Sequence, residues 1–116
     1  IIQDNLSNAI EQGLYRPFYM HRTGHWLGLD VHDAGPYRET EQDEDEPDWR
    51  KLEPGMVLTI EPGLYITPES GAPERFWGIG IRIEDDAVVT ASGCDLITRG
   101  VPVARQEIEA LVQSGS

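Results

Sequence analysis

A histidine-rich segment places the tightest constraint on this chain. All three histidines of the sequence, His21, His25 and His32, lie in the stretch HRTGHWLGLDVHDAG at residues 21–35. Histidine is the commonest metal ligand in proteins, and its ring titrates near neutral pH, so it also serves as a proton carrier. Three imidazoles gathered in one short segment therefore predict a site for metal binding or proton transfer.

Two glutamates further along the chain are candidate partners for this segment. Glu61 follows the apolar, strand-like run at residues 56–60, and Glu84 follows a second such run at residues 78–83. A charge at a buried position is costly unless it is paired or bound to a metal. One of the three imidazoles with Glu61 and Glu84 is therefore a candidate metal site. One imidazole with two carboxylates favours Mn²⁺, Fe²⁺ or Co²⁺ over a thiolate-type zinc site.

The residue pattern predicts an α+β fold with a mostly antiparallel sheet and helices near both ends. The predicted helices cover residues 1–12, ending at Gly13, and residues 103–112. The predicted strands cover residues 18–20, 56–60, 64–66, 77–84, 87–90 and 96–98. Asp85 and Asp86 lie between two of these runs, so we expect them at the turn of a hairpin.

Residues 39–48, ETEQDEDEPD, hold seven acids and predict a solvated loop. A calcium-binding loop is the alternative, but the spaced ligands and central glycine of an EF-hand are missing. The net charge of −12 over 116 residues argues against nucleic acid and anionic membranes as partners. The length predicts one domain.

The single cysteine, Cys94, cannot form an internal disulfide, and we expect a structural thiol. No apolar run reaches the length of a membrane span. Residues 1–12 lack the basic start of a signal peptide. A cytoplasmic location is the default expectation.

Three segments together resemble the M24 metallopeptidase family, which has the pita-bread fold. They are HWLGLDVHDAG at 25–35, LEPGMVLTIEPGLYI at 52–66 and GIGIRIEDDAVVT at 78–90. Within this family they are most similar to the aminopeptidase P (Xaa-Pro aminopeptidase) group. The resemblance implies cleavage of the bond between an N-terminal residue and a following proline, in peptides with proline in the second position.

The resemblance also implies two divalent metal ions, with Mn²⁺ as the first expectation and Co²⁺, Fe²⁺ or Zn²⁺ as alternatives. His25, Glu61 and Glu84 would be metal ligands, with Glu84 bridging the two ions. Glu61 would also handle a proton as the bound water is activated.

Other residues would act around the metals. The resemblance implies that His32 hydrogen-bonds the scissile carbonyl oxygen, and that His21 binds substrate near the proline side of the scissile bond. Arg82, two residues before Glu84, would support the metal-binding carboxylates, and Tyr65 could line the site.

The chain departs from the family at its start. The family has five metal ligands, and two of them are aspartates on upstream strands. The acids before His21 here are Asp4 and Glu11, both in the predicted first helix. We therefore expect residues 1–116 to be the C-terminal part of the catalytic domain, the C-terminal half of a pita-bread fold, without activity on its own.

Two alternatives to an aminopeptidase remain. One is a prolidase-type dipeptidase, although Asp33-Ala34-Gly35 after His32 looks more like the aminopeptidase group. The other is a peptide- or protein-binding module of the same fold, against which the retained His25, Glu61 and Glu84 argue. An exposed apolar face on the chain would drive association, so we expect a homo-oligomer.

Overall fold

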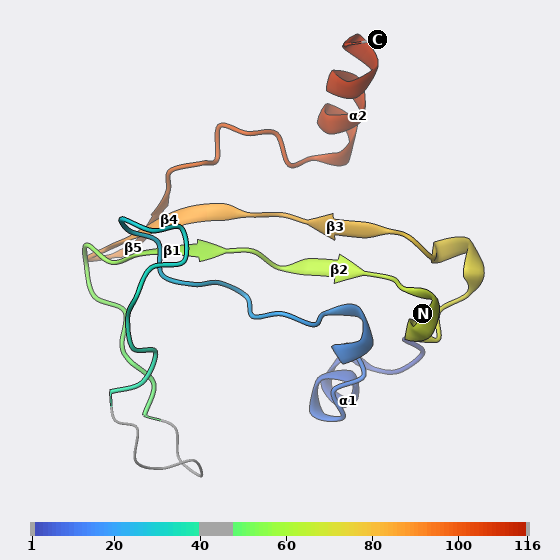
Figure 1. Ribbon diagram of the computed structural model, residues 1–116, viewed down its shortest axis with the longest axis horizontal. Coiled ribbons are helices and arrows are strands. Elements are labelled where there is room, and N and C mark those ends of the chain that lie inside the picture. Colours follow the sequence, from blue (N-terminus) through green and yellow to red (C-terminus); the bar gives the residue numbers. More distant parts are fainter. Residues whose placement is uncertain (1, 40–47, 116) are drawn as a thin grey trace. The chain divides into compact units, whose positions relative to one another are not determined.

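The computed structural model describes residues 2–39 and 48–115, and the chain divides into two compact units. One unit consists of Ile1–Thr23 and Glu61–Ile83, and the other of Gly24–Ile60 and Glu84–Ser116. Each unit has its own antiparallel sheet, one with three strands and one with two (Figure 1). These sheets and the short helices confirm the predicted α+β class with antiparallel pairing.

The unit of residues 24–60 and 84–116 is built on the three-stranded sheet, in the order β1-β4-β5. Its elements are β1 (Val57–Ile60), β4 (Asp85–Thr90), β5 (Gly93–Leu96) and the helix α2 (Arg105–Ser114). Buried and half-buried positions alternate along β4, as expected for a strand with one face packed inward. Ala87 and Val89 are the buried apolar residues of that strand.

The unit of residues 1–23 and 61–83 holds the two-stranded sheet and a small core. Its elements are α1 (Leu6–Glu11), η1 (Arg16–Phe18), β2 (Gly63–Tyr65), η2 (Pro68–Ser70), η3 (Glu74–Phe76) and β3 (Gly80–Arg82). Phe18, Ile66 and Ala72 form the core, with Phe76 packed against it. Asn5 starts α1, because its side-chain oxygen accepts a hydrogen bond of 3.0 Å from the Asn8 amide.

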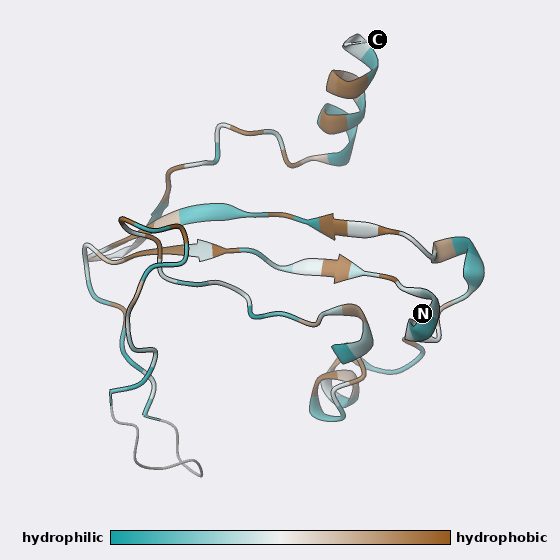
Figure 2. Ribbon diagram, in the orientation of Figure 1, coloured by the Kyte–Doolittle hydropathy of each residue, from teal (hydrophilic) through white to brown (hydrophobic). Residues whose placement is uncertain are grey.

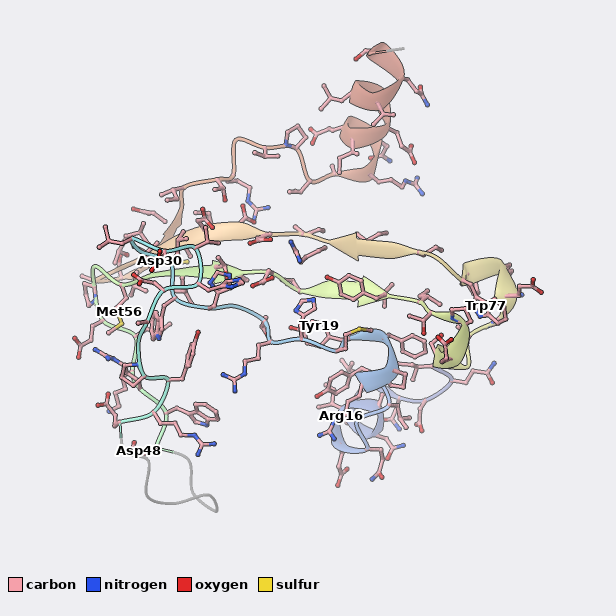
Figure 3. The ribbon with its side chains drawn as sticks, in the orientation of Figure 1. Arg16, Tyr19, Asp30, Asp48, Met56 and Trp77 are labelled. Carbon is pink, nitrogen blue, oxygen red and sulfur yellow. The ribbon has the colours of Figure 1, made fainter. Side chains whose placement is uncertain are left out.

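The predicted strand at residues 18–20 is wrong. Phe18 ends the 3₁₀ helix η1, which Pro17 helps to start, and the Phe18 ring is buried in the core. Arg16 and Tyr19 lie at this turn (Figure 3). Proline fixes φ at a value suited to a helical turn. The aromatic residues therefore indicated tertiary packing rather than extended structure.

The predicted hairpin with Asp85 and Asp86 at its turn is also wrong. Both aspartates belong to β4, and Asp85 is only 5% exposed. The chain reverses at residues 91–92, between β4 and β5, while β3 pairs with β2. An aspartate can occupy this buried strand position because Arg99 and Thr98 supply its hydrogen bonds.

The other predicted elements differ from the observed ones mainly in where they begin and end. Val57–Ile60 and Gly63–Tyr65 match the predicted strands closely, whereas α1 is shorter than predicted and β5 begins before residue 96. Cys94 lies exposed on β5 and is a free thiol. Residues 40–47 of the predicted acidic loop lie outside the described residues.

The C-terminal helix α2 carries apolar residues that are exposed to solvent. Ile108, Leu111 and Val112 are exposed, and none of the helix residues is buried. Figure 2 shows the apolar positions of α2 as brown bands. No helix within residues 2–39 and 48–115 combines the length and the apolar character needed to cross a membrane.

Candidate metal and substrate site

The ends of two paired strands place the two candidate carboxylates. Ile60, the last residue of β1, is paired with Asp85, the first residue of β4. Glu61 directly follows Ile60, and Glu84 directly precedes Asp85. In an antiparallel pair, residues opposite each other project from the same face of the ladder. Glu61 and Glu84 therefore lie one position beyond the last pair of this ladder, each next to one of its two strands.

The backbone of β1 also fixes the candidate imidazole. The His25 amide donates a 3.0 Å hydrogen bond to the Thr59 hydroxyl, and the Thr59 amide donates to the His25 carbonyl at 2.9 Å. Thr59 itself is buried. Next to His25, Gly24 lies so close to β1 that a Cβ built on it would be 2.0 Å from the Thr59 carbonyl oxygen. The histidine segment therefore lies directly against the strand that precedes Glu61.

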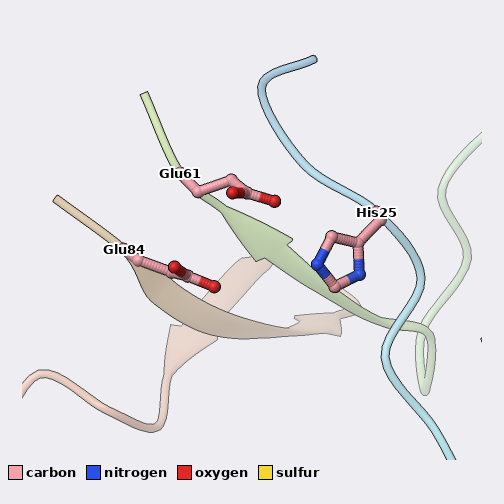
Figure 4. Close-up of side chains that lie close together, drawn as sticks. All are labelled: His25, Glu61 and Glu84. Carbon is pink, nitrogen blue, oxygen red and sulfur yellow. The ribbon is translucent and has the colours of Figure 1, made fainter. Parts of the chain in front are cut away.

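These placements bring three ligand atoms together. His25, Glu61 and Glu84 each offer one ligand atom, and the three atoms lie within 4.8 Å of one another (Figure 4). Ligand atoms on opposite sides of one ion are about 4–5 Å apart when each bond is about 2.0–2.6 Å. The donor set and its spacing therefore fit one hard divalent cation.

The His25 ring has a defined tautomer in this arrangement. Its Nδ1 lies 2.9 Å from the Trp26 carbonyl oxygen, which can only accept a hydrogen bond. Nδ1 therefore carries the proton and Nε2 carries the lone pair that a metal needs. Metal-binding histidines commonly have such a hydrogen bond on the second nitrogen, since it holds the ring in its binding orientation.

A loop stabilised by Asp33 brings His32 back to His25. The Asp33 amide donates to the Trp26 carbonyl at 3.0 Å, and its carboxylate accepts from the amides of Leu29 and Ala34 at 3.2 and 2.9 Å. The exposed His32 ring then meets the His25 ring edge-on, with centroids 4.2 Å apart. Two of the three histidines are therefore neighbours.

Gly28 is required by the same loop, which gives a first prediction. A Cβ at Gly28 would be 1.7 Å from Asp33 Oδ2. In Gly28→Ala the carboxylate must move and lose its bond to Leu29, at a cost of about 1 kcal/mol. We expect the variant to fold and its His32 ring to move away from His25. NMR would detect this movement as a change in the ring-current shifts of the His32 protons. Unchanged shifts would show that Asp33 does not hold this loop.

Arg82 lies beside one of the candidate ligands. Its Nε is 3.8 Å from Glu61 Oε2, and the Glu61 side chain is 13% exposed whereas that of Arg82 is half exposed. Arg82 is the last residue of β3, and it pairs with Gly63 on β2. The guanidinium of Arg82 therefore faces a mostly buried carboxylate, and its positive charge can offset some of the negative charge of Glu61.

His21 lies in a separate aromatic cluster. Its Nδ1 faces the Arg22 carbonyl at 2.7 Å, so Nδ1 donates, and its Nε2 accepts from the Tyr65 hydroxyl at 2.8 Å. The ring contacts Tyr65 and Tyr19, with centroids 5.3 and 5.1 Å away. The sequence suggested Tyr65 as a residue lining the site, and the structure places it in contact with His21.

Sequence reasoning missed the residues that support the site. Thr59 and Asp33 make the hydrogen bonds that position His25 and His32. Aspartate is common in loops because its side chain hydrogen-bonds nearby backbone amides, so Asp33 had a recognisable signal. Threonine is common in strands, so nothing in the sequence indicated that the Thr59 hydroxyl accepts a hydrogen bond from His25.

Comparison with known proteins places these residues in a family. The model of metallopeptidase family M24 matches residues 2–91. The chain is 50% identical over 112 residues to "Xaa-Pro aminopeptidase" of Escherichia coli K12, covering 97% of this chain and 24% of that protein. The chain thus spans about a quarter of the length of the relatives that it matches.

Solved structures agree with this match. Aminopeptidase PepP of Pseudomonas aeruginosa is similar with a TM-score of 0.83 and 48% identity, over 97% of this chain and 24% of that one. Zinc-substituted E. coli aminopeptidase P in complex with product is similar with a TM-score of 0.82 and 50% identity, over 99% and 24%. The likeness confirms the predicted relation to the pita-bread fold. The chain belongs to metallopeptidase family M24.

Proposed function

We propose that residues 1–116 are the C-terminal part of the catalytic domain of a metal-dependent aminopeptidase. The enzyme would hydrolyse the bond between an N-terminal residue and a following proline. The observation that carries this proposal is the convergence of ligand atoms from His25, Glu61 and Glu84. The 50% identity to an Xaa-Pro aminopeptidase supports the substrate class. The activity belongs to the longer protein, and we expect the isolated chain to be inactive.

The metal centre would hold two divalent ions, with His25, Glu61 and Glu84 as ligands from this chain and Glu84 bridging. The remaining ligands would be two aspartates outside these residues. Mn²⁺ is the first candidate for the native metal, with Co²⁺, Fe²⁺ or Zn²⁺ as alternatives, and carboxylate-rich ligation suits Mn²⁺. Bound divalent ions supply a water activated near neutral pH and polarise a carbonyl group.

The residues of this chain would divide the remaining work. Glu61 would accept and return a proton at its carboxylate, and Arg82 at 3.8 Å would stabilise that carboxylate and orient it. His32 would donate a hydrogen bond to the scissile carbonyl oxygen, where negative charge develops. Its contact with His25 supports this role, because it keeps the ring beside a candidate metal ligand.

His21 would bind the substrate near the proline ring. Its contacts with Tyr19 and Tyr65 support this role, because aromatic faces suit an apolar ring. The hydrogen bond from Tyr65 holds the His21 ring in one orientation. The substrate would be a peptide with proline in its second position.

Several further features remain proposals about the longer protein. We propose that it acts in the cytoplasm as a homo-oligomer and does not bind nucleic acid or membranes. The net charge of −12 supports the absence of polyanionic partners. The exposed apolar residues of α2 support association with another surface.

Product analysis with the longer protein tests the proposed function. The enzyme is expected to release the first residue of a tripeptide with proline in second position, in the presence of Mn²⁺. Hydrolysis of an Xaa-Pro dipeptide but not of the tripeptide would favour the prolidase alternative. Binding of either peptide without hydrolysis, at any divalent metal tested, would favour the binding module.

His32→Ala in the longer protein gives a second prediction. Loss of a hydrogen-bond donor to a developing oxyanion costs about 10²–10³ in kcat. We expect a loss of this size with unchanged metal content, measured by steady-state kinetics and by elemental analysis of the purified protein. Asp30→Ala, in the same exposed loop, is the control and is expected to keep its activity. Equal kcat in the two variants would remove His32 from the mechanism.

A further inference from the structure

Asp85 is a buried acid that has no part in the candidate site described above. It is the first residue of β4, directly after Glu84, and it is only 5% exposed. A buried carboxylate is costly to place in a protein, and an apolar residue of similar size is often at least as stabilising. Its presence therefore calls for a role other than stability alone.

Both oxygens of the Asp85 carboxylate accept hydrogen bonds. Its Oδ1 accepts a 3.1 Å hydrogen bond from the Thr98 hydroxyl, and its Oδ2 accepts from the Arg99 guanidinium. The Thr98 oxygen in turn accepts from the Asp86 amide at 2.9 Å. The Asp86 carbonyl accepts from the Ile97 amide at 2.9 Å. The start of β4 is thereby bonded to the segment that follows β5.

These contacts lie on the face of β4 opposite to Glu84. Successive side chains of a strand point to opposite faces, and Asp85 shares the buried face with Ala87 and Val89. The carboxylate of Glu84 points the other way, toward His25 and Glu61 (Figure 4). The hydrogen bonds of Asp85 can therefore hold the backbone below Glu84 without touching a metal.

We propose that Asp85, Thr98 and Arg99, here called the Asp85 anchor, position the candidate metal ligand Glu84. Asp85 is a positioning residue and not a further ligand. Groups that orient metal ligands through hydrogen bonds change metal affinity by about 10–100-fold when mutated. The metal part of this inference rests on the proposed function.

Two substitutions remove different parts of the anchor in the 116-residue chain. Asp85→Asn keeps the shape and removes the charge that pairs with Arg99. Thr98→Val keeps the shape and removes the hydroxyl, and Thr98→Ser is the conservative variant that restores it. Asp95→Asn, an exposed aspartate on β5, is the matched control for lost charge.

Hydrogen exchange by NMR tests whether the anchor holds the backbone. We expect Asp85→Asn and Thr98→Val to speed exchange of the Asp86 amide at least about tenfold, because each weakens the bonds around that amide. Thr98→Ser and Asp95→Asn should leave it close to the wild-type rate. Unchanged exchange in both disruptive variants would overturn the proposal, whether or not the chain binds metal.

Calorimetric titration with Mn²⁺ tests whether the anchor positions Glu84. We expect the dissociation constant to rise about 10–100-fold in Asp85→Asn and Thr98→Val, measured well below their unfolding temperatures, with recovery in Thr98→Ser. Faster exchange with an unchanged dissociation constant would show a purely structural role and overturn the positioning claim. A wild-type chain without Mn²⁺ binding would show that the two aspartates outside these residues are needed for affinity, and hydrogen exchange at Asp86 would then decide the anchor alone.

Discussion

Glu84→Ala is expected to abolish divalent-metal binding by this chain. Glu84 offers one of three ligand atoms that lie within 4.8 Å of one another, and among the described residues Glu61 is the other acid of that group. Loss of an orienting neighbour already costs about 10–100-fold in metal affinity, so loss of a ligand should exceed the upper value. Calorimetric titration with Mn²⁺ would show no measurable heat of binding at concentrations where the wild type saturates.

Two further variants make this result specific. Glu84→Gln keeps the size of the side chain and removes its charge, and we expect nearly the same loss. Glu53→Ala removes an exposed glutamate from the same unit and should bind Mn²⁺ as the wild type does. Glu84 is exposed, so its loss should leave the unfolding midpoint of the metal-free chain nearly unchanged. Wild-type affinity in Glu84→Ala would refute the metal site.

The candidate metal ligands Glu61 and Glu84 are the part of the site that the sequence predicted most directly. Glu61 and Glu84 each follow an apolar run, and a charge at a buried position is costly unless it is paired or bound to a metal. The structure places Glu61 after β1 and Glu84 before β4, where the pairing of Ile60 with Asp85 brings them together. The local pattern predicted the positions, and strand pairing explains their proximity.

The position of Asp85 could not be predicted in the same way. Two consecutive aspartates after an apolar run are typical of a turn. Asp85 lies in a strand only because Thr98 and Arg99, 13 and 14 residues further on, reach its carboxylate. Such partners depend on how β4 and β5 pair, and hydrophobic periodicity contains no information about them. The predicted hairpin failed for this reason.

The contact between His25 and His32 shows a similar limit. A separation of seven residues does not bring two side chains together in extended structure. They meet because the Trp26 carbonyl accepts from the Asp33 amide and because Gly28 leaves room for the Asp33 carboxylate. In the sequence, Gly28 suggested a close approach to the backbone. Only the structure shows that the approaching group is the Asp33 carboxylate. Roles for these histidines came from the resemblance, and they stay proposals.

Gly24→Ala is expected to destabilise the chain more than any other single methyl addition at the site. A Cβ at Gly24 would lie 2.0 Å from the Thr59 carbonyl oxygen and 3.0 Å from its carbonyl carbon. Because the obstacle is the backbone of β1 and not the end of a flexible side chain, the histidine segment itself must move. Overpacking of this kind costs about 1–3 kcal/mol, and we expect a value near the upper end.

The same displacement should reach the candidate metal site, because Gly24 is bonded to His25 and the His25 amide donates to the Thr59 hydroxyl. Denaturant unfolding measures the loss of stability, and Mn²⁺ titration of the folded chain measures the loss of affinity. Gly100→Ala is the matched control, since a Cβ there meets no atom within 4 Å. Wild-type stability and affinity in Gly24→Ala would mean that His25 does not depend on close packing against β1. The backbone hydrogen bonds would then have to hold the imidazole by themselves.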